Sequence, residues 1–256
     1  MSLQACAELV ERGDPDRFLA TMAAAPAARA ILFPIYAFNL EVARAPWVAS
    51  EPMIAEMRLQ FWRDVAEEIG QGKPARAHEV AEPLAGAVQA EDAPLLDALV
   101  AARRWDVYRD AFEDDARFDA YIDATSGNLT WIAARALGAS EEAQQAVRDI
   151  AWGGGVGAFL RAVPELESRG RVPLLDGRPE GVKALAERAL ARFRRGRAAQ
   201  SKISAAARSS LFAFSTTEPL LRSIVADPHR VADGRLGISE FAKKARLLKT
   251  SVTGRI

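Results

Sequence analysis

Apolar residues recur at three- and four-residue spacing along most of the chain, the spacing that places side chains on one face of an α-helix. The strongest pattern lies in residues 28–69 and predicts two core helices. Their apolar positions are Ile31, Ile35, Phe38 and Val42, and then Ile54, Met57, Phe61, Val65 and Ile69. No stretch alternates apolar and polar residues as a half-buried strand would. The sequence therefore predicts an all-α protein.

Capping residues, prolines and glycines mark the ends of further helices. Asp14 is a predicted N-cap with Pro15 at the first helical position, Pro26 leads into the first core helix, and Gly70 ends the second. Further helices are predicted at residues 3–12, 15–24, 80–90, 94–110, 118–138, 141–165, 182–202 and 238–249, with an apolar, inward-packing segment at 205–221.

Four glycines fall within residues 153–157, inside the helix predicted at 141–165. A phosphate-binding glycine loop follows a strand, and the flanks here are helical, so nucleotide binding is disfavoured. Each glycine costs a helix roughly 1 kcal/mol relative to alanine. We therefore expect a weakened or broken helix at this point.

Length and composition limit the protein classes that fit. The 256 residues are enough for a single domain, 1–256, with a large core. One cysteine excludes an intramolecular disulfide, two histidines exclude a zinc cluster, and the N-terminal residues lack a secretory signal pattern, which favours a cytoplasmic location. Residues 18–39 carry one charge, Arg29, but Pro26 and Pro34 interrupt them, so a buried helix pair is expected there and not a membrane span.

Two stretches resemble conserved elements of a known family. Residues 35–47, IYAFNLEVARAPW, with the following RLQFWRDVAEEI, and residues 155–175, GVGAFLRAVPELESRGRVPLL, are similar to helices of the squalene/phytoene synthase family. The resemblance extends over about residues 15–250. It implies an isoprenoid synthase-type, single-domain helical bundle around a central cavity.

The same resemblance points to lost chemistry. Enzymes of the family carry two aspartate-rich motifs whose carboxylates, one helical turn apart, hold Mg²⁺ ions on a diphosphate. The corresponding positions are Ala43, Arg44 and Trp47 in the first motif and Ala162 and Leu166 in the second. None is a carboxylate, and Glu165 and Glu167 lie out of phase, so the resemblance implies no catalytic residue, no metal site and no cofactor.

Three arginines keep the frame of the second motif and are candidates for contact with an anion or diphosphate, namely Arg161, Arg169 and Arg171. The favoured alternative is that Arg161 pairs with an acidic neighbour while Arg169 and Arg171 face water.

Family members that keep the frame and lose both motifs resemble the mitochondrial assembly factor for respiratory complex I. The resemblance thus implies a non-enzymatic assembly factor whose partner is a respiratory-complex subunit or an assembly intermediate. The alternative is a divergent head-to-head prenyltransferase that acts on prenyl diphosphates with Mg²⁺. In either case a hydrophobic or prenyl ligand could occupy the cavity.

Charge is divided unevenly along the chain. Residues 1–168 contain 15 basic and 27 acidic residues, whereas residues 169–256 contain 19 and 7. The basic residues of the helix at 182–202 are expected on an exposed face as contacts for acidic lipid or a partner, especially Arg188, Arg192, Arg195 and Lys202. This would place the protein peripherally on the inner face of a bioenergetic membrane. A solvated face balancing the acidic half is the alternative.

Two other uses of charge are disfavoured. Nucleic acid is not an expected partner, because Phe193 is the one aromatic residue among these cations. The acidic run at 106–123 is expected to be a solvated loop and not a metal site, because the adjacent Asp114 and Asp115 side chains diverge.

Overall fold

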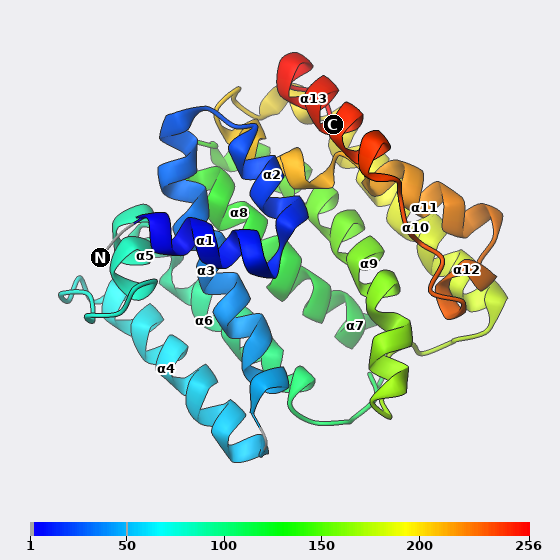
Figure 1. The fold of residues 1–256 in the computed structure, drawn as a ribbon, viewed down its shortest axis with the longest axis horizontal. Coiled ribbons are helices and arrows are strands. Elements are labelled where there is room, and N and C mark those ends of the chain that lie inside the picture. Colours follow the sequence, from blue (N-terminus) through cyan, green and yellow to red (C-terminus); the bar gives the residue numbers. More distant parts are fainter. Residues whose placement is uncertain (1–2, 50) are drawn as a thin grey trace.

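The computed structural model describes residues 3–49 and 51–256, and none of them forms a strand. The α-helices are α1 Leu3–Gly13, α2 Pro15–Met22, α3 Pro26–Val48, α4 Pro52–Gly70, α5 Ala81–Ala87, α6 Ala93–Ala102, α7 Asp115–Ile122, α8 Asn128–Ala136, α9 Gln144–Ser168, α10 Pro179–Ala198, α11 Thr217–Ala226, α12 His229–Ala232 and α13 Glu240–Thr253. The prediction of an all-α bundle is confirmed (Figure 1).

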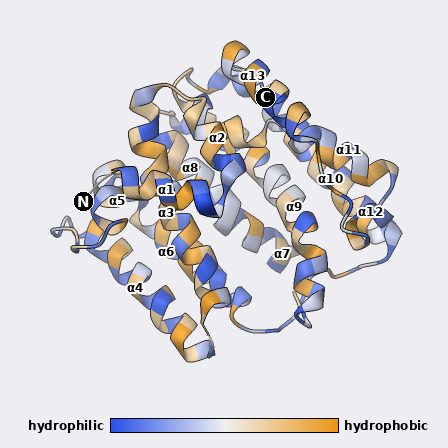
Figure 2. Ribbon diagram, viewed as in Figure 1, coloured by the Kyte–Doolittle hydropathy of each residue, from blue (hydrophilic) through white to orange (hydrophobic). Residues whose placement is uncertain are grey.

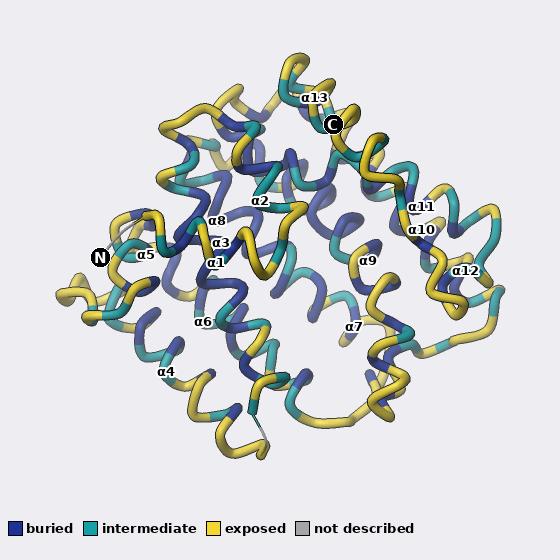
Figure 3. Tube along the Cα trace, in the orientation of Figure 1, coloured by how far each residue is buried: buried dark blue, intermediate teal, exposed yellow. Residues whose placement is uncertain are grey.

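Helix α3 runs through the interior. It is buried nearly all round between residues 32 and 40, because α1, α2, α4, α5 and α8 all pack against it. Figure 3 shows this helix as mostly buried. The expected pair of helices at 18–39 is present as α2 and α3, but α3 alone is deeply buried, because α2 buries only Ala20 and Thr21. No described helix has the length and apolar character that a membrane crossing needs.

Helix α4 buries a face that agrees only in part with the one predicted. Val65 is buried as predicted, and Phe61 and Ile69 pack against the core. Leu59, Trp62 and Ala66 are buried, whereas Ile54 and Met57 are 40% and 67% exposed. Trp62 packs edge-on against Phe38 with ring centroids 5.3 Å apart. The largest ring on the helix thus sets its orientation toward α3, and the methionine face is left at the surface.

Helix boundaries agree where local signals are strong. The Asp14 carboxylate accepts the backbone N–H of Arg17 at 3.0 Å, so it caps α2 as predicted. The helix predicted at 94–110 is shorter, because a 3₁₀ turn, Arg103–Asp106, follows α6. The helix predicted at 118–138 contains a π-helical turn, Asp123–Gly127, between α7 and α8.

The glycine cluster does not break α9, which continues from Gln144 to Ser168, so that prediction is wrong. A Cβ added at Gly153 would lie 2.7 Å from the Phe193 Cβ and 2.9 Å from the Ala189 carbonyl oxygen. One added at Gly196 of α10 would lie 2.6 Å from the Ala146 carbonyl oxygen. The glycines therefore allow α9 and α10 to approach closely, and this packing offsets their low helix propensity.

Candidate functional site

A cavity of about 280 Å³ lies between α3 and α9. Ala43 and Trp47 line it from α3, and Ala162 and Leu166 line it from α9. Each pair is four residues apart and so shares a helix face. The structure thus brings together the two motif positions inferred from sequence, with a central cavity as expected, while Arg44 is exposed and does not line it.

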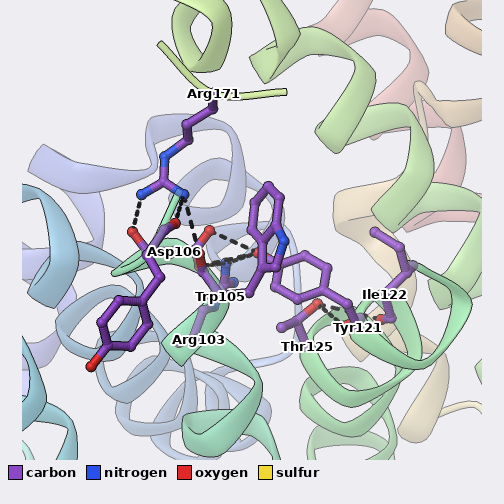
Figure 4. A network of polar contacts seen from close by, with 8 residues as sticks. Arg103, Trp105, Asp106, Tyr121, Ile122, Thr125 and Arg171 are labelled. Carbon is purple, nitrogen blue, oxygen red and sulfur yellow. Dashed lines mark hydrogen bonds and ion pairs between the residues drawn. The ribbon is translucent and has the colours of Figure 1, made fainter. Parts of the chain in front are cut away.

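The cavity wall includes a carboxylate, Asp106, that the motif positions did not indicate. Its oxygens accept the Tyr121 hydroxyl, both at 3.1 Å, and the Arg103 guanidinium at 3.1 Å. Arg103 also donates to the Tyr121 oxygen at 3.0 Å. These three side chains form one closed polar network, shown in Figure 4.

In this network the Arg103 guanidinium stays charged and the Tyr121 phenol stays neutral. Burial raises the pKa of Tyr121 above its usual value, and this outweighs the opposing effect of Arg103. Burial disfavours the charge on Arg103, but Tyr121 and Asp106 outweigh burial and raise the pKa of that guanidinium. The Asp106 carboxylate therefore already has a cation, and it has little to offer a metal ion.

Metal binding has no other support in the part of the chain that the structure describes. That part contains no group of three or more His, Cys, Asp or Glu side chains placed to hold an ion. One unused acceptor does line the cavity: Asn39 Oδ1 is buried and has no hydrogen-bond partner among the described residues. A single amide oxygen suits a hydroxyl or N–H of a bound molecule better than Mg²⁺.

Arg171 is buried, contrary to the prediction that it faces water. Its guanidinium donates to the backbone carbonyl oxygens of Trp105, at 3.1 Å, and of Asp106 and Tyr108. It also lies between the rings of Trp47 and Trp105, 5.1 Å and 5.4 Å from their centroids. Arg171 therefore holds the loop after α6 in place, and its donors are used by the protein and not free for an anion (Figure 4).

The other two arginines behave as the alternative expected. Arg161 lies 3.8 Å from the Asp16 carboxylate, and Arg169 pairs with Glu165 at 2.7 Å on the surface. Arg169 also covers the Trp47 ring at 4.8 Å. Neither side chain reaches into the 280 Å³ cavity.

A second cavity, of about 410 Å³, adjoins the first. The two share the wall residues Arg17, Gly154, Ala158, Ala162 and Phe214. The second is lined further by α2, α11 and α13, and by the cations Arg161, Lys243 and Lys244. Together the two cavities form a mainly apolar inner chamber and an outer chamber whose wall carries these cations and the carboxylates of Asp14 and Asp16.

The expectation of an exposed basic face on the helix predicted at 182–202 is wrong for two of its four candidate residues. Arg188 pairs with Asp119 at 3.0 Å, and Arg192 pairs with Asp149 at 2.9 Å, so both are partly buried. Arg195 pairs with Asp149 as well, at 2.7 Å, although its side chain is 65% exposed.

Lys202 is exposed, as expected. Some ion pairs, such as Arg188–Asp119 and Arg195–Asp149, join the basic half of the chain to the acidic half, whereas Lys202 stays at the surface.

The acidic run at 106–123 is also only partly the solvated loop that was expected. Asp114 caps α7 by accepting the Arg117 backbone N–H at 2.8 Å. Asp106 is 4% exposed, and Asp119 is in contact with Arg188. Sequence reasoning missed Asp106 and its partners because nothing in the local pattern shows that a 3₁₀ turn directs this carboxylate inward.

The fold and the paired motif positions agree with comparisons to known proteins. A family model described as squalene/phytoene synthase matches residues 10–174, and the chain belongs to that family. A crystal structure of a dehydrosqualene synthase in complex with ligand has the same fold, with a TM-score of 0.82 at 15% identity, over 98% of this chain and 95% of that one. Squalene synthase HpnC from Alicyclobacillus acidocaldarius gives a TM-score of 0.75 at 14% identity, over 89% and 94%.

Curated relatives of higher identity carry a different name. The chain is 28% identical over 170 residues to NADH dehydrogenase (ubiquinone) complex I, assembly factor 6 of Homo sapiens, covering 65% of this chain and 51% of that protein. The Drosophila melanogaster homolog is 26% identical over 179 residues, covering 66% and 53%. The chain therefore spans about half the length of the curated relatives it matches.

Proposed function

We propose that this chain is a non-enzymatic assembly factor for a respiratory membrane complex of the complex I type. The cavity between α3 and α9 carries the proposal, because Ala43, Trp47, Ala162 and Leu166 line it where the family resemblance places Mg²⁺ ligands. The name of the human and insect relatives, complex I assembly factor 6, supports the same role.

The chemistry of the cavity favours binding over catalysis. Loss of diphosphate from a prenyl substrate develops negative charge that cations must stabilise in a dry site. Mg²⁺ needs several oxygen ligands in near-octahedral geometry, and Asp106, the one carboxylate in the described wall of the 280 Å³ cavity, is occupied by Tyr121 and Arg103. The alternative function, a divergent prenyltransferase, would need ligands that the described wall of the 280 Å³ cavity does not offer.

Four further features belong to this proposal. The partner is a respiratory-complex subunit or an assembly intermediate. The site of action is the cytoplasmic or equivalent inner face of a bioenergetic membrane. Residues 1–256 act as one domain, which the 98% coverage by a single-chain synthase fold supports. The cavity holds an apolar or prenyl molecule without turning it over, and no Mg²⁺ or other cofactor is required.

The purified chain with Mg²⁺ is expected to make neither squalene nor phytoene from farnesyl or geranylgeranyl diphosphate. The reason is the lack of ligand oxygens at positions 43, 47, 162 and 166. Product analysis by chromatography is the measurement, with a family synthase that retains both aspartate motifs assayed beside it. Metal-dependent product that disappears with a chelator would establish the prenyltransferase alternative.

Deletion of the gene that encodes this chain is expected to lower the amount of assembled complex I-type enzyme in the source organism. Native gels stained for NADH dehydrogenase activity measure this, and expression of the wild-type chain should restore it. Other respiratory complexes on the same gel are the control. An unchanged complex in the deletion strain would reject the assembly role, whatever the outcome of the prenyl diphosphate assay.

A further inference from the structure

Helix α13 carries an apolar stripe that no described part of the protein covers. Phe241, Leu248 and Val252 are 84%, 66% and 78% exposed, and Ala245 between them is exposed as well. Their spacings of four, three and four residues place them on one face of the helix. Figure 3 shows α13 as largely exposed at the edge of the molecule, and Figure 2 shows hydrophobic and hydrophilic residues interspersed along it.

The opposite face of α13 fixes this orientation. Leu247 packs against the core, and Thr250 is 4% exposed. Lys243 donates to the Asp16 carboxylate at 3.0 Å, and Gly254 ends the helix in the left-handed conformation with φ of 63°. The apolar stripe therefore points outward because the other side of the helix is docked.

Cations border the stripe on both sides. At about 100° per residue, Lys244 and Lys249 lie about 60° and 80° from Phe241 in opposite directions around the helix. Both are exposed. The acidic residue of the helix, Glu240, is drawn into a pair with Lys243 at 2.9 Å. The outer surface of α13 thus combines exposed apolar side chains with positive charge on both sides of them.

We propose that α13 is a membrane-contacting helix that lies in the headgroup layer of an anionic bilayer. Phe241, Leu248 and Val252 enter the acyl boundary, and Lys244 and Lys249 contact lipid phosphates. Charge complementarity favours an anionic bilayer as the binding partner. The stripe is one face of a helix at the edge of the molecule and has cations on both sides, which matches a flat anionic surface (Figure 1).

A second apolar patch shows why these borders matter. Met53 and Met57 of α4 are 72% and 67% exposed, a similar exposure of apolar side chains. The charges beside that patch are mixed: Glu51 and Arg58 are exposed, and Glu56 pairs with Arg104 at 3.0 Å. These charges cancel and leave no net positive border to attract anionic lipid, so α4 provides a matched control for exposed apolar surface alone.

Membrane contact through α13 would bring the bilayer close to the 410 Å³ cavity. Lys243, Lys244 and Leu247 line the 410 Å³ cavity, so that cavity lies directly beneath the helix. A bilayer bound to α13 would therefore adjoin the outer chamber. The inference rests on α13 and does not depend on a role in complex assembly.

Co-sedimentation of the full chain with vesicles tests the proposal. Binding is expected to vesicles of phosphatidylcholine mixed with phosphatidylglycerol, and much less to phosphatidylcholine alone. The Phe241→Ser, Leu248→Ser, Val252→Ser triple variant should lose binding by at least about tenfold, because apolar insertion supplies much of the affinity. Lys244→Glu with Lys249→Glu should remove the preference for anionic lipid.

Variants on two other surfaces test whether vesicle binding is specific to the outer face of α13. Met53→Ser with Met57→Ser, and Lys202→Glu on the segment after α10, should bind vesicles as wild type does. Loss of binding in either one with retention in the triple variant would overturn the proposal. Equal binding to both vesicle types, no binding to either, or concentration-dependent self-association that the triple variant abolishes would overturn it too.

A spectroscopic readout guards against misfolding of the variants. A polarity-sensitive fluorophore on Val252→Cys should shift to the blue with anionic vesicles. Cys6 is the one native cysteine, and burial, with a smaller contribution from Glu79, raises its thiol pKa to about 11, so labelling should favour the new site. An unshifted spectrum with protein sedimented on the vesicles would show that another face makes the contact.

Discussion

Replacing Arg171 with alanine should destabilise the fold by about 3–5 kcal/mol. The guanidinium donates to the carbonyl oxygens of Trp105, Asp106 and Tyr108, and the Arg171 residue is 9% exposed. Each buried acceptor left without a partner costs about 1–3 kcal/mol. The variant also loses the contacts of the guanidinium with the rings of Trp47 and Trp105. Urea unfolding followed by circular dichroism measures the change.

Arg169 provides the matched control, two residues earlier in the same segment. Its ion pair with Glu165 has side chains 48% and 65% exposed, so Arg169→Ala should cost less than about 1 kcal/mol. Arg171→Lys should remain destabilised, because one ammonium group cannot reach three carbonyl oxygens as the planar guanidinium does. Equal stability of the Arg169→Ala and Arg171→Ala variants would contradict a structural role for Arg171.

Replacing Asp149 with asparagine should cost about 3 kcal/mol at neutral pH, the lower end of the range for breaking a buried ion pair. The Asp149 side chain is 2% exposed and accepts from Arg192 at 2.9 Å, Arg195 at 2.7 Å and Gln145 at 3.0 Å. The substitution leaves two adjacent guanidinium groups without their anion. Arg195 can turn into water, which is why the lower end is expected.

The pH dependence identifies the charge as the cause. Burial alone would raise the pKa of Asp149, but hydrogen bonds and charge from Arg195 and Arg192 outweigh it and hold that pKa below its usual value. A carboxyl with a depressed folded-state pKa stabilises the fold above its unfolded pKa, about 3.9, and stops doing so as pH falls through the folded value. The difference between wild type and Asp149→Asn should therefore be constant from pH 5 to 7 and shrink below about pH 4.

Glu187→Gln is the control for this measurement. Glu187 pairs with Lys183 at 4.0 Å on the same helix, α10, with both side chains more than half exposed. Its loss should change stability by less than about 1 kcal/mol at any of these pH values. A stability difference for Asp149→Asn that stays unchanged down to pH 2 would show that packing, and not charge, accounts for its effect.

The sequence by itself determined the helical class, the family and several helix ends. Those features are local: apolar spacing, the Asp14 cap and Gly70 act within a few residues of chain. The family frame likewise located both motif positions, 43 and 47 on α3 and 162 and 166 on α9, which the structure brings to one cavity. Spacing of four residues fixes a shared face wherever the helix lies.

Tertiary structure alone decided how the distant residues are used. Gly153 lies in an unbroken helix because α10 packs against it, and Trp62 turned α4 away from its methionine face. Arg171 was expected to face water because the carbonyl oxygens that it binds are 63 or more residues away. The two arginines that pair with Asp149 are likewise 43 or more residues away, so no local pattern points to them. Charge and glycine content are properties of the sequence, but burial depends on which segments meet, and that is why neither could be placed before the helices were packed.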